Sequence, residues 1–295
     1  MSEAVSVNKP LTKRKKESMF KQVCKRLVKN PIAMTGLVIL ILIVLASIFA
    51  PLLAPYDPNF MDYANLKTGP NAQHILGCDQ LGRDILSRML YGGRYSLALG
   101  FICAMIGLIL GVFFGCIVGY AGGTVDNIAM RICDIWSSIP SMLLAILVST
   151  ALGNGFFNTV LAMTLGSIPG SVRNTRAMVL KERSMEYLEA AKAMNCSEMK
   201  IMFKHMMPNI IPFKIVGTTG NIGATIMQAS SLSFIGLGMD AATPEWGAMC
   251  SNGRVLMLTH PYMIIFPGLI ILITVLAFNL FGDGLRDAMD PKLKD

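Results

Sequence analysis

Long runs of apolar residues, separated by short polar stretches, dominate the pattern along this chain. A helix that crosses the hydrocarbon core of a bilayer needs about 20 mostly apolar residues. Six segments are close to that length and predict membrane-spanning helices: Ile32–Leu53, Leu97–Tyr120, Ile132–Leu152, Phe156–Val172, Ile215–Leu237 and Tyr262–Phe281. The fourth segment is the weakest because it is short and contains Pro169. The pattern therefore predicts an all-α integral membrane protein with six transmembrane helices.

Composition supports a membrane environment and argues against nucleic acid. Of the 295 residues, 53% are hydrophobic and only 15% are charged, whereas soluble domains carry about 25% charged residues. The formal net charge is +8, but the basic residues occur in blocks beside the apolar runs. That pattern is typical of loops held against anionic lipid. We therefore expect membrane lipid, and no nucleic acid, as a partner.

The distribution of Lys and Arg predicts the orientation. If both termini are cytoplasmic, the inner segments hold 21 basic residues and the outer segments hold five, as the positive-inside rule requires. The chain then divides into a basic cytoplasmic tail (1–31), a first transmembrane helix with an extracytoplasmic loop (32–93) and a core of five transmembrane helices (94–295). Asn30 as N-cap and Pro31 at the first helical position predict the start of the first span.

The long inner segment at about 173–214 predicts two short helices joined by a tight turn. Glu189–Met194 favours a helix, Asn195 fits a left-handed stop, and Ser197 fits the N-cap of a second helix that Pro208 ends. Such a hairpin is a natural docking element for a soluble partner. An ordinary amphipathic helix at the membrane interface is the alternative.

Polar and small residues mark two of the predicted spans. The fifth span contains Thr218, Asn221, Thr225 and Gln228, which either bond helices together or line a wet path through the membrane. The second span carries glycines four residues apart, which predict close packing against another helix: Gly107, Gly111, Gly115 and Gly119.

Charged residues at the start of the third span predict an ion pair. Arg131 and Asp134 lie three residues apart near the expected inner surface, where such charges reach toward the polar headgroups. We expect them to pair with each other.

Several kinds of chemistry have no sequence support. No glycine is followed by lysine, so the chain has no G-x-x-x-x-G-K phosphate loop and is not an ATPase by itself. No histidine or cysteine spacing predicts a metal site, and no nucleophile-and-base set predicts a catalytic site. A membrane-embedded enzyme is thus disfavoured. The alternative of an ATP-independent channel or secondary transporter lacks the acidic residues near the middle of the spans that proton coupling needs.

Two motifs resemble those of a known family. Glu189-Ala190-Ala191, followed by Asn195 and by the run His-Met-Met-Pro-Asn over residues 205–209, resembles the EAA loop of ABC importer permeases. A stretch that begins in the outer loop reads His-Ile-Leu-Gly-Cys-Asp-Gln-Leu-Gly-Arg-Asp-Ile-Leu-Ser-Arg over residues 74–88 and runs on to Tyr91-Gly92 and Arg94. It resembles the dipeptide/oligopeptide/nickel branch. That motif includes Gly77, Asp79, Gly82, Arg83 and Asp84.

Further stretches near residues 234–247 and 278–291 extend the resemblance to about residues 30–295, and it is strongest to the second, C-type permease of such systems. Departures from the family pattern include Asn195 in place of the loop glycine, Cys78 in place of a threonine and Ala241-Ala242 in place of a proline pair.

The resemblance implies a type I ABC importer permease in the bacterial cytoplasmic (inner) membrane. It also implies a second homologous permease, two cytoplasmic ATPase subunits that bind ATP and Mg²⁺, and an extracytoplasmic solute-binding protein. The ATPase-coupling residues would be Glu189, Ala190, Ala191, Asn195, His205 and Pro208. The chain itself would hold no cofactor and catalyse no reaction. The solute, whether a di- or oligopeptide, a glutathione-like thiol or a nickel chelate, stays open. We expect Cys78 and Cys250 to be free thiols.

Overall fold

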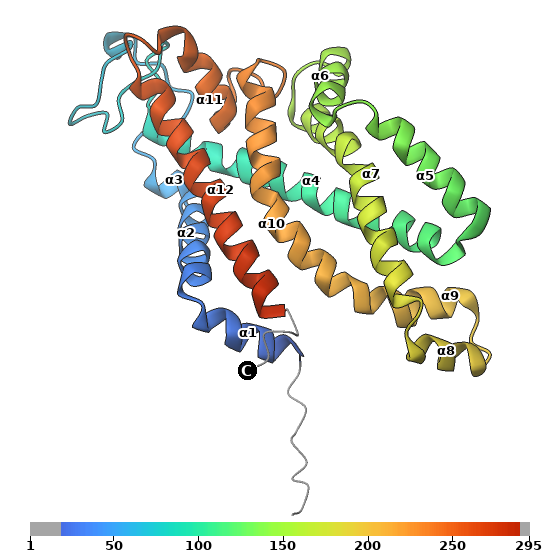
Figure 1. The fold of residues 1–295 in the computed structure, drawn as a ribbon. Coiled ribbons are helices and arrows are strands. Elements are labelled where there is room, and N and C mark those ends of the chain that lie inside the picture. Colours follow the sequence, from blue (N-terminus) through green and yellow to red (C-terminus); the bar gives the residue numbers. More distant parts are fainter. Residues whose placement is uncertain (1–18, 290–295) are drawn as a thin grey trace, which may run out of the picture.

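The computed structural model describes residues 19–289, and every regular element within that range is helical (Figure 1). Most of the predicted basic tail and the last two residues of the 278–291 stretch lie outside this range. The first described helix is α1 (Met19–Lys29), followed by α2 (Pro31–Ile48) and the short α3 (Ala50–Leu53). The side chain of Asn30 accepts hydrogen bonds from the backbone nitrogens of Ile32 and Ala33, which confirms the predicted N-cap.

Helix α4 (Ile85–Ala121) is the longest element and is reached through a loop that contains the 3₁₀ turn η1 (Tyr63–Asn65). It packs along α7 (Phe156–Glu182), and the four predicted glycines of α4 face that helix: Gly107, Gly111, Gly115 and Gly119. A Cβ added at Gly111 would lie 1.9 Å from Oγ of Ser171, and one at Gly115 would lie 2.5 Å from Cβ of Thr175. The predicted glycine interface is therefore confirmed.

The third predicted span is not one continuous helix. Helix α5 (Gly123–Ser137) and helix α6 (Ser141–Leu152) are bent by 74° at the intervening break. The cause is local, because Pro140 has an extended backbone (ψ 133°) and a proline disfavours helical geometry in the residue before it. The predicted Arg131–Asp134 pair is also wrong, since Asp134 lies 3.3 Å from Arg173 of α7 instead.

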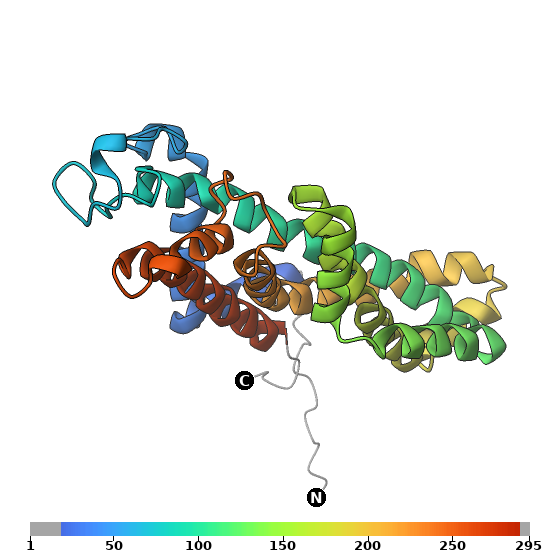
Figure 2. The same cartoon turned by 90° about the horizontal axis from the view of Figure 1, so that it is seen from above.

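The rest of the chain forms the helices from α8 to α12, of which α10 lies at the centre of the bundle. After α8 (Glu186–Ala193) and α9 (Glu198–Lys200), a π-helical turn, η2 (Ile201–Met206), runs directly into α10 (Met207–Phe234). Helix α11 (Trp246–Gly253), the turn η3 (Arg254–Leu256) and α12 (Tyr262–Met289) complete the fold. Figures 1 and 2 show α10 between the α2–α12 pair and the group formed by α5, α6 and α7.

Three of the helices within residues 19–289 are long and apolar enough to cross a membrane, namely α2, α4 and α12. The bent α5–α6 pair makes a fourth if it is one span. Helices α7 and α10 are longer than α2 but more polar, because they carry residues such as Asn174 and Asn221. Residues 19–289 thus form an all-helical membrane bundle in which the polar helix α10 lies at the centre (Figures 1 and 2).

Candidate functional site

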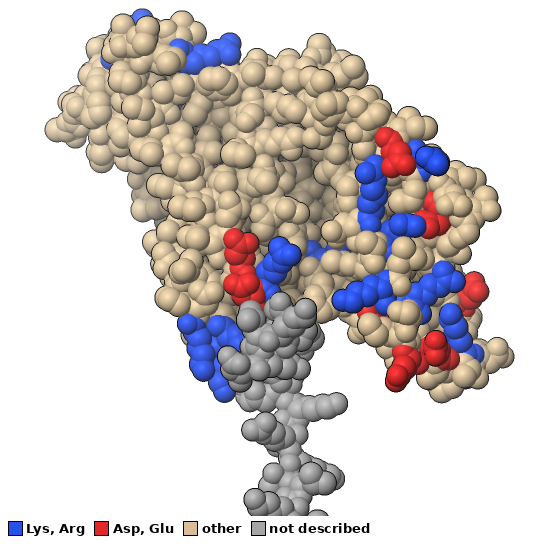
Figure 3. Space-filling view, viewed as in Figure 1, with Lys and Arg blue, Asp and Glu red and all other residues tan. Residues whose placement is uncertain are grey.

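A cleft of about 940 Å³ lies between α4, α7, α10 and the C-terminal end of α12. The space-filling view shows this hollowed face, with charged residues gathered along its lower part (Figure 3). Thr218, Asn221, Thr225 and Gln228 all line the cleft. Their spacing of three and four residues places them on one face of α10. The four polar residues singled out in the sequence therefore form one wall.

The facing wall comes from α7 and was not predicted. Ser167, Ser171 and Asn174 line the cleft, again at helical spacing. The Ser171 hydroxyl donates to the carbonyl oxygen of Gly107 at 2.8 Å, so part of this wall is fixed against α4. The sequence did contain a signal for this wall, because small and polar residues recur at intervals of three and four along α7.

Lys214 is a further lining residue that the sequence prediction missed. It lies one turn before Thr218 on α10, lines the same cleft and is only 7% exposed. The predicted span began at Ile215 and so excluded it. A lysine one turn before a polar stripe, at the edge of a predicted span, was the signal that could have identified it.

The predicted hairpin ends α8 with a left-handed residue at Asn195, as expected. Asn195 has φ of 55°, its backbone N–H donates to the carbonyl of Lys192, and the N–H of Cys196 donates to the carbonyl of Ala191. This pair of bonds is the Schellman arrangement that closes a helix C-terminus. The turn therefore fixes the direction in which the chain leaves α8.

Helix α8 presents one face to the bundle and the other to the surroundings. Leu188 and Ala191 are buried in an apolar cluster with Val179 of α7, Met206 of η2 and Ile210 of α10. Glu189 and Ala190 point outward and are exposed. The coupling residues predicted on α8 are thus divided between a packing face and a free face.

The predicted end of the second helix at Pro208 is wrong. The chain stays helical through Pro208, which occupies the first turn of α10 after the π-helical turn. Proline has no N–H to donate, and it follows directly on the π-helical turn, where the α-helical hydrogen-bond pattern is already interrupted. Ser197 starts α9 but makes no side-chain capping bond. His205 lies in the π-helical turn, with a buried Nε2 that has no partner among the described residues.

The motif predicted to be extracytoplasmic forms a buried polar network. Asp79 accepts from Nε of Arg83 at 2.7 Å, and Arg88 donates to the carbonyls of Pro58 and Ala242. Asp84 caps α4 through the backbone N–H of Ser87. These bonds connect the loop before α4 with the loop before α11, so the motif holds this end of the bundle together.

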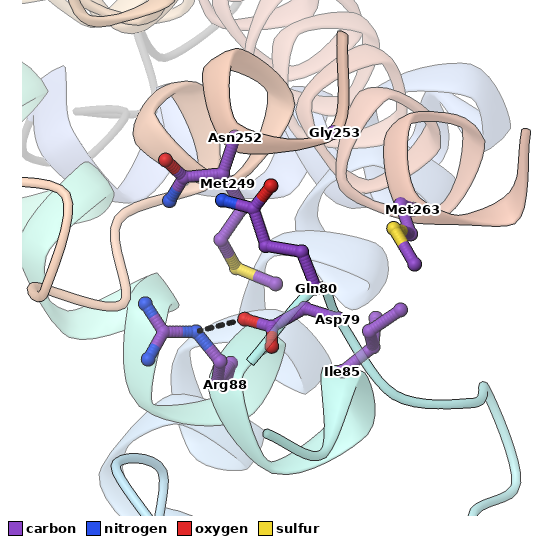
Figure 4. Close-up of a pocket in the computed structure, with 8 residues that line it drawn as sticks. All are labelled: Asp79, Gln80, Ile85, Arg88, Met249, Asn252, Gly253 and Met263. Carbon is purple, nitrogen blue, oxygen red and sulfur yellow. Dashed lines mark ion pairs between the residues drawn. The ribbon is translucent and has the colours of Figure 1, made fainter. Parts of the chain in front are cut away.

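Backbone geometry explains the glycines of the motif. Gly77 and Gly82 have φ of 80° and 77°, a region that strongly favours glycine. Figure 4 shows Asp79 and Arg88 beside a cavity of about 10 Å³, roughly the space of one water molecule. The motif is therefore a scaffold and leaves no room there for a solute.

Cysteine and histidine chemistry adds no further site among the described residues. Cys78 and Cys250 are both free thiols, as expected, and burial raises the pKa of each thiol to about 12. Within residues 19–289 no cluster of three or more His, Cys, Asp or Glu side chains is arranged to hold a metal ion.

Comparison with known proteins identifies the family. The model described as "Binding-protein-dependent transport system inner membrane component" matches residues 111–295. A model for the N-terminal TM domain of oligopeptide transport permease C matches residues 18–71. The Glutathione transport system permease protein GsiD of Escherichia coli O1:K1 / APEC is 43% identical over 271 residues, which are 92% of this chain and 89% of that protein.

Other comparisons agree. The GsiD protein of Pectobacterium atrosepticum is 43% identical over 277 residues, or 93% of this chain and 92% of that protein. A chain from "Inward facing conformations of the MetNI methionine ABC transporter: CY5 native crystal form" has the same fold, with a TM-score of 0.52 and 19% identity over 67% of this chain and 94% of that one. An ATP-independent channel or secondary transporter finds no support here. The chain belongs to the binding-protein-dependent transport system inner membrane components and is a transmembrane permease subunit of an ABC importer of the peptide/oligopeptide type.

Proposed function

We propose that the cleft is this subunit's half of the solute pathway and that α8 is the element through which ATPase subunits operate it. The proposal rests on the packing that joins α8 to the cleft. Helix α8 packs on η2 and the start of α10, and α10 carries the polar side chains that line the cleft. A rigid displacement of α8 is transmitted to the cleft wall because packed helices move as bodies.

Transport by this chain requires other subunits, which provide ATP hydrolysis, solute capture and the other half of the pathway. We propose a second homologous permease, two cytoplasmic ATPase subunits and an extracytoplasmic solute-binding protein as partners. Glu189, Ala190, Ala191, Asn195, His205 and Pro208 form or support the docking loop. ATP and Mg²⁺ bind to the partner ATPases, and this chain holds no cofactor and is not itself catalytic.

Docking is tested by cross-linking. A cysteine in place of exposed Ala190, in a background without native cysteines, is expected to form a disulfide with a cysteine on the surface of an ATPase subunit. The matched control is a cysteine in place of Leu188, which is 1% exposed on the buried face of α8. Equal cross-linking of both positions, or of neither, would contradict docking through the free face of α8.

Six membrane crossings fit this function. Helices α7 and α10 complete the set formed by α2, α4, α5–α6 and α12, since their polar groups face a wet cleft rather than lipid. The 21-to-5 division of basic residues favours cytoplasmic termini. The docking loop then faces the ATPases.

For the solute we propose glutathione or a similarly small peptide, because the curated relatives are named as glutathione permeases and the cleft volume suits a ligand of that size. The complex with its partner permease, ATPases and binding protein is reconstituted into liposomes that contain ATP. Uptake of labelled glutathione, competed by di- and tripeptides but not by free sugars, is expected. Absence of uptake of all these peptides would contradict the proposed cargo.

A further inference from the structure

Lys214 is a cation buried in the wall of the cleft without a counter-charge. Its side chain is 7% exposed, and its Nζ lies 3.4 Å from both Oγ of Ser171 and Oδ1 of Asn174. Both partners are neutral. None of the ion pairs formed by residues 19–289 includes Lys214.

The other charges of the cleft do not neutralise it. Lys181 and Arg286 also line the cleft, and Asp287 is the one carboxylate among the described lining residues. Three cations against one anion leave the cleft with a net charge of +2. Burying an ammonium without an opposite charge costs folding free energy. Such a group is retained at a functional site when its counter-charge arrives with a ligand.

We propose that Lys214 binds the carboxylate of the solute inside the cleft, so that the pathway selects solutes with a free carboxylate. This inference rests on the proposed function of the cleft as a pathway. Lys214 begins the stripe that continues through Thr218, Asn221, Thr225 and Gln228. A carboxylate at Lys214 would therefore place the rest of a small peptide along polar side chains of α10. An ammonium and a carboxylate form a short, charge-assisted hydrogen bond.

The first arm of the test measures uptake. The reconstituted complex is prepared with Lys214→Gln, with Lys214→Arg and with Lys29→Gln, a control that removes the same charge from the exposed surface of α1. We expect Lys214→Gln to lower glutathione uptake about tenfold or more, the scale of a lost hydrogen bond between charged groups, while the ATPases still copurify. Lys214→Arg and Lys29→Gln are expected to retain uptake.

The second arm measures the charge of the cleft without any cargo. Thr218→Cys, in a background without native cysteines, is reacted with a negatively charged and a positively charged methanethiosulfonate reagent. The ratio of the two rates is expected to favour the anionic reagent, and Lys214→Gln should lower it roughly tenfold.

The outcomes separate the two proposals. Wild-type uptake that Lys214→Gln leaves unchanged, or a rate ratio that does not depend on Lys214, would overturn the carboxylate site. Loss of uptake in both Lys214→Gln and Lys214→Arg, with loss of copurifying ATPases, would assign Lys214 a merely structural role and also overturn it. No uptake by the wild-type complex, with a ratio that still depends on Lys214, would overturn glutathione as the cargo and leave the anion site standing.

Discussion

Asn195 controls the turn after α8 because its φ of 55° is a conformation that few residues adopt without strain. Glycine adopts it freely, and asparagine at modest cost. Asn195→Gly is therefore expected to leave uptake and ATPase association unchanged. Asn195→Val should strain the turn by roughly 1–2 kcal/mol and displace Glu189 from its docking position. Normal abundance with weakened ATPase copurification is the expected result, and valine behaving like glycine would contradict the account of the turn.

Cys78 is expected to be an unreactive thiol. The thiolate is the reactive form, and burial raises the Cys78 pKa from 9.0 to about 12. In the folded protein at about pH 8, below the ordinary thiol pKa, N-ethylmaleimide should modify exposed Cys24 and spare Cys78, as measured by peptide mass spectrometry. Because the pKa is raised on folding, this thiol favours the folded state below pH 9, and that contribution declines between pH 9 and 12. Equal labelling of the two thiols would show that the loop is open.

Close packing of α4 on α7 depends on glycine at the contact positions, whereas other helical glycines have free space around them. A Cβ at Gly115 would lie 2.5 Å from Cβ of Thr175 and 2.9 Å from the carbonyl oxygen of Val172, whereas one at Gly268 of α12 meets nothing within 4 Å. Gly115→Ala is expected to destabilise the protein by about 1–3 kcal/mol. Gly268→Ala should be neutral or slightly stabilising. Thermal unfolding in detergent measures both, and equal midpoints would contradict close packing of α4 on α7.

The sequence predicted those structural features that depend on a few neighbouring residues. The cap at Asn30, the turn at Asn195, the glycine face of α4 and the polar stripe of α10 each follow from a few neighbouring residues. The bend between α5 and α6 and the continuation of the helix through Pro208 were missed because one proline is compatible with either outcome. The α7 wall and Lys214 were missed because a cleft exists only after distant helices pack.

The orientation of the whole chain in the membrane can be tested directly. In a background without native cysteines, Ser184→Cys near α8 and Asn59→Cys in the loop before α4 are exposed single thiols. We expect a membrane-impermeant thiol reagent on intact cells to label position 59 and to label position 184 only after permeabilisation. Labelling of position 184 alone on intact cells would reverse the orientation and separate α8 from the ATPases.

If the proposed function is correct, this chain moves solute only when partner ATPases hydrolyse ATP. The most direct measurement compares glutathione uptake by liposomes that hold the complete complex, the complex without the ATPases, or this chain alone, with either ATP or ADP inside. We expect accumulation against a gradient by the complete complex with ATP and by no other combination. Uptake by this chain alone, or equal uptake with ADP, would contradict the proposed ATP-dependent function.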